Sequence, residues 1–176
     1  QADVCEARSQ TARGGQVQGD GGFIETSGLI NLHFGGQVDA SASNGAGGTW
    51  LLDPTDLTIG AVTTAGLATL PNTPVAGTTT FADNGGALNT AVVAASDIAT
   101  VLSAGTNVVV TTTSGGLAPN GGRITIASSI TADLSGGNKN VTLTFDADEN
   151  IIVNAGVTIS AVNANNNDSL SLDLQA

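Results

Sequence analysis

The chain has 176 residues, which suits one domain or one segment of a longer repeat structure. Fifteen acidic residues against four basic ones give a formal net charge of −11. Nucleic-acid phosphates and anionic membrane surfaces would repel such a chain, so we exclude both as partners. Hydrophobic residues make up 40%, but aromatics only 3%. Small and β-branched apolar side chains favour strands with narrow, repetitive interiors, and their ordered alternation argues against a disordered Gly/Ser/Thr segment.

Residues 1–13 form a polar N-terminal segment in which we find no strand pattern. The segment lacks the apolar core of a signal peptide, and no apolar run approaches the length needed to cross a bilayer. We therefore predict no membrane insertion and expect a processed product or an excised piece of a longer protein. Cys5 is the only cysteine, so it cannot close an internal disulfide, and a link to another chain is one hypothesis for it.

Residues 14–60 carry a first set of strand patterns. Residues 61–106 then change character, with many Ala and Thr residues, and we interpret them as an insertion outside the repeating strands. One short helix is predicted within this insertion, over residues 96–104. Ser96 is its candidate N-cap and Gly105 its stop signal. Its apolar residues follow the i, i+3, i+4 spacing of one helix face: Ile98, Val101 and Leu102.

Residues 107–176 return to more regular strand patterns. Apolar residues alternate with others in four segments: Val108–Val110, Ile124–Ile126, Val141–Phe145 and Leu170–Leu174. Alternation with period two places the apolar side chains on one face of each strand, and strands this short bury that face only by stacking on one another. The sequence therefore predicts an all-β fold, a parallel β-helix (solenoid), with further strands at 151–153 and 157–159.

An antiparallel β-sandwich is the alternative all-β fold, because it uses the same short strands. Candidates for its hairpin turns are Asp20-Gly21, Asn44-Gly45 and Asn120-Gly121. These dipeptides lie in longer Gly-rich loops, and the repeated Gly-Gly pairs before strands favour the corners of a β-helix.

The segment from Trp50 to Asp56 is the sharpest candidate for a ligand site. An exposed Trp50 would offer a platform on which a sugar ring stacks, with Asp53 and Asp56 as polar partners. We favour a structural interpretation, because so few aromatic residues are present. In that interpretation Trp50 packs under a loop, and Asp53-Pro54 sets a turn before the strand 57–59.

Other polar motifs predict neither a catalytic nor a metal site. The stretches 146–150 and 165–168 are rich in oxygen ligands but match no known calcium loop. The only histidine, His33, has Glu25 and Asp39 nearby in sequence but no nucleophile motif. The basic residues are too scattered for the groove of a polysaccharide-cleaving enzyme: Arg8, Arg13, Arg123 and Lys139. We predict no enzyme activity, no metal and no cofactor.

Three segments resemble one family of bacterial exoproteins. GGFIETSG (residues 21–28), VDASA (38–42) and GGTWLLDPTDLTI (47–59) look like filamentous haemagglutinin-type adhesins, the large products of two-partner secretion. Parts of residues 96–176 are similar to the region C-terminal to this motif in the same proteins. Residues 1–13 and 61–95 carry no resemblance.

The resemblance implies a right-handed β-helix, export by a dedicated outer-membrane secretion partner, and a location outside the cell or on the bacterial surface. It also implies a role in cell adhesion, aggregation or biofilm formation, with a receptor or glycan on a host or bacterial cell as ligand. This sequence departs from the family because it has nothing similar to the N-terminal secretion domain of those much longer proteins.

We therefore predict an adhesin segment or stalk in which residues 61–95 supply contacts with a cell. A second hypothesis is an extracellular fibre, a homopolymer whose β-helix units stack end to end. The final strand pattern, Leu170–Leu174, is followed by no polar cap, and exposed strand edges template further strands. A polysaccharide-active β-helix enzyme is the third hypothesis.

Overall fold

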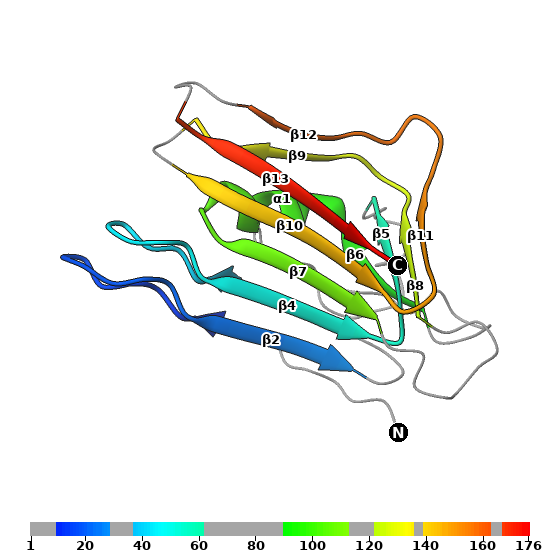
Figure 1. Ribbon diagram of the computed structural model, residues 1–176, viewed down its shortest axis with the longest axis horizontal. Coiled ribbons are helices and arrows are strands. Elements are labelled where there is room, and N and C mark those ends of the chain that lie inside the picture. The colour runs from blue at the N-terminus through cyan, green and yellow to red at the C-terminus, as the bar shows by residue number, and fades with distance from the viewer. Residues whose placement is uncertain (1–9, 29–36, 62–89, 113–121, 136–138, 163–166) are drawn as a thin grey trace, which may run out of the picture.

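The computed structural model describes residues 10–28, 37–61, 90–112, 122–135, 139–162 and 167–176 (Figure 1). The strands are β1 (Gln10–Thr11), β2 (Phe23–Gly28), β3 (Val38–Asp39), β4 (Thr49–Pro54), β5 (Asp56–Gly60), β6 (Thr90–Ala94), β7 (Asn107–Thr112), β8 (Arg123–Ile126), β9 (Ile130–Asp133), β10 (Asn140–Ala147), β11 (Asn150–Val153), β12 (Ile159–Val162) and β13 (Ser169–Gln175). The only helix in these residues is α1 (Ala95–Ser103). A mostly β fold with one short helix was the prediction, and this part of it is confirmed.

The strands form parallel sheets that the chain visits in turn. A five-stranded sheet, which we call the main sheet, has the order β13-β10-β7-β4-β2, and a four-stranded second sheet has the order β11-β8-β5-β6. A third sheet pairs β12 with β9, and β1 pairs with β3. After β7 the chain enters the second sheet as β8 and the third as β9, then returns to the main sheet as β10, beside β7. Figure 1 shows the strands of the main sheet side by side, in the order given above. We call each passage of the chain through the sheets a layer, so that neighbouring strands of one sheet belong to neighbouring layers.

Parallel pairing contradicts the antiparallel sandwich that the hairpin-like dipeptides left open. Every strand pair in the described residues is parallel. The Gly21 N–H donates to the Ala46 carbonyl at 2.9 Å, so the turns at Asp20-Gly21 and Asn44-Gly45 stack on each other and close no hairpin. Asn120-Gly121 lies outside the described residues.

Side chains on the inner face of the main sheet stack in columns, with one residue from each strand. The first column is Ile24, Trp50, Val108, Leu143 and Leu172. The second is Thr26, Leu52, Val110, Phe145 and Leu174. The residues from β4, β7 and β10 in both columns are 0% exposed. The predicted alternation over 107–176 is thus confirmed in β7, β8 and β10, where inward residues are buried and outward residues are not.

Helix α1 lies close to its predicted place but begins differently. Its N-cap is Ala94, which makes no side-chain hydrogen bond, so the prediction of Ser96 as N-cap is wrong. Ala94 has the extended conformation of an N-cap residue, but alanine has no side-chain oxygen to accept a hydrogen bond from the first helical turn. The predicted apolar face is confirmed, because Ile98, Val101 and Leu102 are buried. Gly105 follows the helix with a φ of 92°, a conformation that favours glycine.

Residues 90–106 belong to the core, which corrects the interpretation of 61–106 as an insertion outside the strands. β6 pairs with β5 on the edge away from β8, so the chain steps back by one strand before it continues to β7. α1 then packs against β9. The Asp133 N–H on β9 donates to Ser103 Oγ of the helix at 2.8 Å. The helix thus provides a hydrogen-bond acceptor along the edge of β9 that has no neighbouring strand in the described residues. Residues 62–89 lie outside the described residues.

The N-terminal segment also differs from its prediction. Gln10 and Thr11, where the sequence shows no strand pattern, form β1 and pair with Val38 and Asp39. These residues form a strand because they pair with β3. Two polar residues show no periodicity, so the local sequence does not predict a strand there.

The Gly-Gly pairs allow neighbouring layers to approach closely before each strand begins. A Cβ atom on Gly48 would collide with the backbone of Gly22, and one on Gly47 would collide with the Gly105 carbonyl. Backbone atoms on both sides prevent relaxation, so these corners require glycine.

The side-chain columns predict that a Leu→Ala substitution lowers the free energy of unfolding by different amounts in the neighbouring strands β10 and β13. Leu143→Ala, at a fully buried position, should destabilise the fold by about 2–5 kcal/mol. Leu172→Ala, one layer further at 46% exposure, should cost about 1 kcal/mol, because little apolar surface is lost from the interior. Chemical denaturation at low protein concentration measures both, and equal costs would contradict the layer assignment.

Candidate functional site

Two turns with the pattern Asp-x-Ser follow short strands. The Asp39 carboxylate accepts hydrogen bonds from the N–H and the hydroxyl of Ser41, at 3.0 and 2.6 Å. The Asp133 carboxylate accepts the same pair from Ser135, at 3.0 and 2.5 Å. These aspartates therefore shape corners of the fold.

Asn and Asp side chains also connect one layer to the next. Asn107 Oδ1 accepts from the Thr142 N–H at 2.8 Å, across the pair β7–β10. Asp168 Oδ1 accepts from the Lys139 N–H at 2.7 Å. These oxygen-bearing side chains thus accept hydrogen bonds from backbone N–H groups of the neighbouring strand or of the residue that precedes it.

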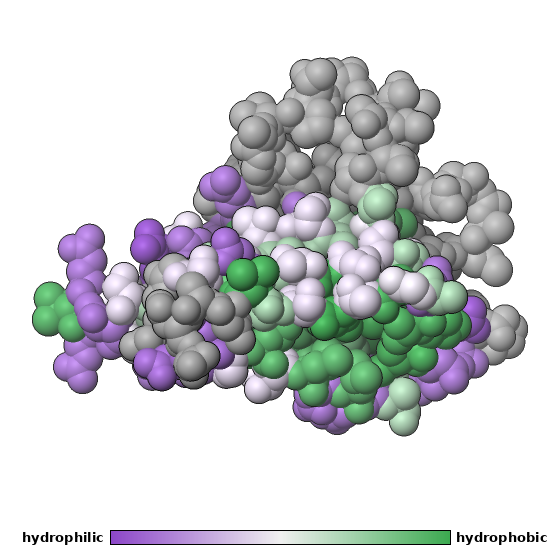
Figure 2. Space-filling model, turned by 90° about the horizontal axis from the view of Figure 1, so that it is seen from above, coloured by the Kyte–Doolittle hydropathy of each residue, from purple (hydrophilic) through white to green (hydrophobic). Residues whose placement is uncertain are grey.

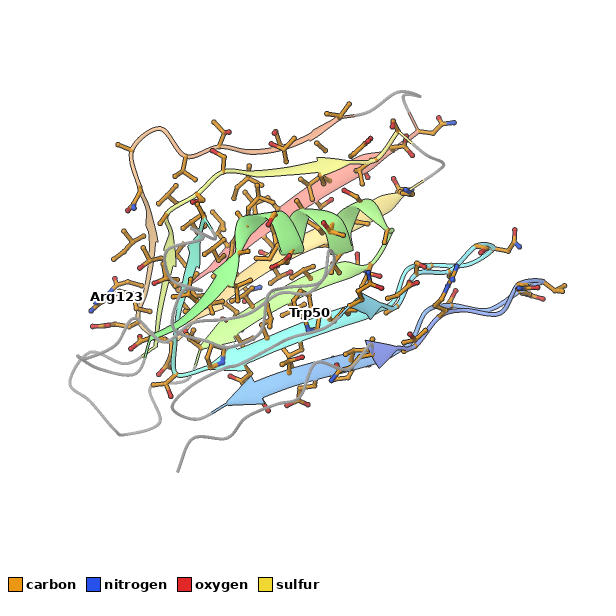
Figure 3. All side chains as sticks on the ribbon, turned by 180° about the vertical axis from the view of Figure 1, so that it is seen from behind. Trp50 and Arg123 are labelled. Atoms are coloured by element: carbon orange, nitrogen blue, oxygen red, sulfur yellow. The ribbon has the colours of Figure 1, made fainter. Side chains whose placement is uncertain are left out.

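Trp50 lies inside the protein. Its side chain is 0% exposed, and Nε1 donates to the buried Thr26 Oγ1 at 3.1 Å (Figure 3). The hypothesis that Trp50 is a sugar-stacking platform is therefore wrong, because a sugar needs an open ring face. The interpretation of Trp50 as a packing residue is confirmed, although it packs within the main sheet's inner column and not under a loop.

The structure separates Asp53 and Asp56 from Trp50 and from each other. Asp53 is on the opposite face of β4, because positions 50 and 53 alternate, and its Oδ1 is buried without a hydrogen-bond partner in the described residues. Asp56 begins β5 in the second sheet, and its Oδ1 accepts from the Arg123 N–H at 2.8 Å. The three residues form no common ligand site.

The described basic side chains have structural partners. Arg13 lies 3.4 Å from Asp39, and Arg123 lies 3.3 Å from Glu149. Lys139 Nζ donates to the Ser103 carbonyl at 2.5 Å, at the end of α1. Figure 3 shows Arg123 at the edge of the molecule, well away from Trp50.

The described residues do not include Cys5, Arg8 or His33, so the structure does not place these side chains. Among the residues that are described, no group of three or more His, Cys, Asp or Glu side chains could hold a metal ion. That covers residues 146–150 but only part of 165–168.

No protein-family model and no curated protein matches the chain. The resemblance to haemagglutinin-type adhesins stays a prediction. Within the described residues, no helix is long and apolar enough to span a membrane.

Two surfaces remain as functional candidates. The outer face of the main sheet carries hydroxyl, amide and carboxylate groups in register across the strands, including Thr142, Thr144 and Asp146 on β10. The end face, formed by the inward side chains of β11, β12 and β13, is apolar. Its residues are Ile151, Val153, Ile159, Ala161, Leu170, Leu172 and Leu174. The predicted strands 151–153 and 170–174 lie within β11 and β13, whereas the predicted strand 157–159 overlaps β12 only at Ile159.

Two buried threonines predict opposite responses to substitution by valine. Thr26→Val removes the acceptor of the Trp50 N–H and should destabilise the fold by about 1–3 kcal/mol. Thr112 is 3% exposed, and its Oγ1 has no hydrogen-bond partner in the described residues, so Thr112→Val should be neutral or stabilising. Thermal or chemical denaturation of both variants checks this, and a stabilising Thr26→Val would contradict the buried indole hydrogen bond.

The Asp133 turn predicts a lowered pKa at an exposed carboxyl. Hydrogen bonds from the hydroxyl and then the N–H of Ser135 stabilise the carboxylate and lower the pKa of Asp133 below its ordinary value, with a smaller contribution from Lys139. Because the folded pKa is the lower one, the stability contribution is present above the unfolded pKa and is lost as the pH falls through the folded pKa. NMR titration should show Ser135→Ala raising the pKa of Asp133, whereas Ser171→Ala should leave it unchanged.

Proposed function

We propose that this chain is a right-handed parallel β-helix segment that serves as a rigid scaffold or stalk in a secreted bacterial surface adhesin. The observation that carries the proposal is the pair of unbroken inner columns through the main sheet, from β2 to β13. Columns of this kind arise when a chain returns to the same sheet once per turn, as in a solenoid. Such a structure lengthens by adding layers and holds ligand groups at fixed spacing.

The outer face of the main sheet is the proposed contact surface for a receptor or glycan on a host or bacterial cell. Its polar side chains are held on paired strands, so binding requires little further ordering of side chains. The predicted contact segment, residues 61–95, falls mostly outside the described residues. Export through an outer-membrane secretion partner is part of the same proposal and rests on the sequence resemblance.

An extracellular fibre is the second candidate. β11, β12 and β13 each leave one edge without a strand partner in the described residues, and such edges template further strands. The fibre hypothesis requires the opposite end of the molecule to be open as well.

Adhesion of protein-coated beads to bacterial and host cells tests the proposal. The double variant Thr142→Lys/Thr144→Lys places two cations on the outer face of the main sheet, and we expect it to reduce bead adhesion at least about tenfold by blocking contact. The matched control, Thr58→Lys/Thr125→Lys, adds the same charge to the outer face of the second sheet and should adhere normally.

Two outcomes would contradict the proposal. If wild-type beads bind no cell type or glycan, the adhesin function is wrong. If both double variants lose adhesion equally, charge and not the main-sheet face controls binding.

A further inference from the structure

The carboxylates on the outer face of the main sheet differ from the other carboxylates of the protein, because the fold gives them no partner. Glu25, Asp53 and Asp146 point outward from β2, β4 and β10. None of the three has a hydrogen bond or an ion pair in the described residues. Asp173 on the same face accepts only from the exposed Gln175, two residues further along β13.

Every other carboxylate in the described part of the chain has a partner. Most accept hydrogen bonds from backbone N–H groups: Asp20, Asp39, Asp56, Asp133 and Asp168. Glu149 lies beside Arg123, and Asp97 and Asp148 also have partners. The fold therefore uses its other carboxylates to shape turns and to join strands, and it leaves the carboxylates of the outer face available to a ligand.

The outer face carries no cation of its own among the described residues. The described basic side chains lie elsewhere, at Arg13, Arg123 and Lys139, and each has a partner there. Figure 1 looks onto the outer face, with α1 behind the sheet. Hydrophobic residues gather instead at the end of the molecule that Figure 2 shows. A cation that approaches the outer face therefore breaks no existing ion pair.

The spacing of the carboxylates favours several cations over one. Asp53 and Asp146 each follow a residue of the same inner column, Leu52 on β4 and Phe145 on β10. Because β7 lies between these strands, the two carboxylates are about two strand spacings, or 10 Å, apart. Glu25 lies one strand from Asp53 and two residues out of register, about 8 Å away. No group of three or more such side chains in the described residues could hold a metal ion.

Apolar side chains lie between the acidic ones. Leu51 and Val109 are paired neighbours on the outer face, and both are partly buried. Lys and Arg side chains lay their aliphatic stems along apolar surface of this kind while their charged groups reach a carboxylate. Asp53 is partly buried as well, so water screens its charge less than the charge of an exposed carboxylate.

We propose that the outer face of the main sheet binds a cationic protein segment, one rich in Lys and Arg. The inference rests on the proposed function, because it names the class of partner for the same face. Fixed carboxylates at Glu25, Asp53 and Asp146 attract the Lys and Arg groups of such a segment and repel the carboxylates or sulfates of an acidic glycan. The rigid sheet holds the acidic groups in place, and the partner supplies the cations.

Fluorescence anisotropy with labelled oligolysine as the probe tests the charge of the partner. The unmodified chain should bind oligolysine, and the affinity should fall as salt is added, because exposed charges are screened beyond about 8 Å at physiological ionic strength. Asp53→Asn/Asp146→Asn keeps the size of both side chains and should weaken binding at least about tenfold. The matched control, Asp133→Asn/Glu149→Gln, removes the same charge from other surfaces and should bind within about twofold of the unmodified chain.

A second variant keeps the test valid if the substitution at the partly buried Asp53 impairs folding. Glu25→Gln/Asp146→Asn changes two exposed side chains of the same face and should also weaken oligolysine binding. Equal loss of binding in the outer-face variants and in the control would overturn the proposal, because total charge and not this face would then determine binding.

Bead adhesion separates the failure of this inference from the failure of the proposed function. Oligolysine should compete with the adhesion of beads that carry the unmodified chain. If the beads adhere to cells but oligolysine neither binds nor competes, the cationic partner is wrong and the adhesion proposal stands. If oligolysine binds the outer face but the beads adhere to no cell, the adhesion proposal is wrong and the selectivity of the face for cations stands. Competition by a neutral glycan and not by oligolysine would also overturn the cationic partner.

Discussion

Parallel strands held in register place each side chain directly over the equivalent side chain of the next layer, and the rest of this structure depends on that constraint. Trp50 has Ile24 on one side and Val108 on the other, so its size and its indole N–H must both be accommodated by adjacent layers. Thr26 accepts the hydrogen bond within that stack. A shift of one residue in any strand would move a whole set of inward side chains to the surface.

The same constraint explains the composition of the corners. Turns must stack at the strand spacing of about 4.8 Å, which leaves no room for a Cβ atom at Gly48 and favours short side chains that satisfy backbone groups nearby. Asp39 and Asp133 do this within their own turns, and Asn107 does it for the next layer. Motifs that suggest ligand chemistry in a linear sequence are therefore explained here by stacking.

Alternation alone predicted β7, β8, β10 and β13, because Val, Ile and Leu recur there with period two. It did not predict β6 (TAVVA) or β9 (ITAD), which are short and hold few large apolar residues, nor the backward step of β6, because pairing with β5 is a long-range choice. For the candidate site, the sequence placed Trp50, Asp53 and Asp56 together. The structure separates them because alternation puts 50 and 53 on opposite faces, and a corner at Thr55 sends Asp56 into another sheet.

The two ends of the layered structure use the same chain chemistry in opposite ways. At one end, the backward step of β6 and the packing of α1 on β9 cover the inner columns with side chains such as Val93 and Ile98. At the other, β13 repeats the Leu-x-Leu alternation of a buried strand and carries a single charge, Asp173, where edge strands usually carry several charges or a proline. β13 therefore has the side-chain pattern of a strand inside a sheet.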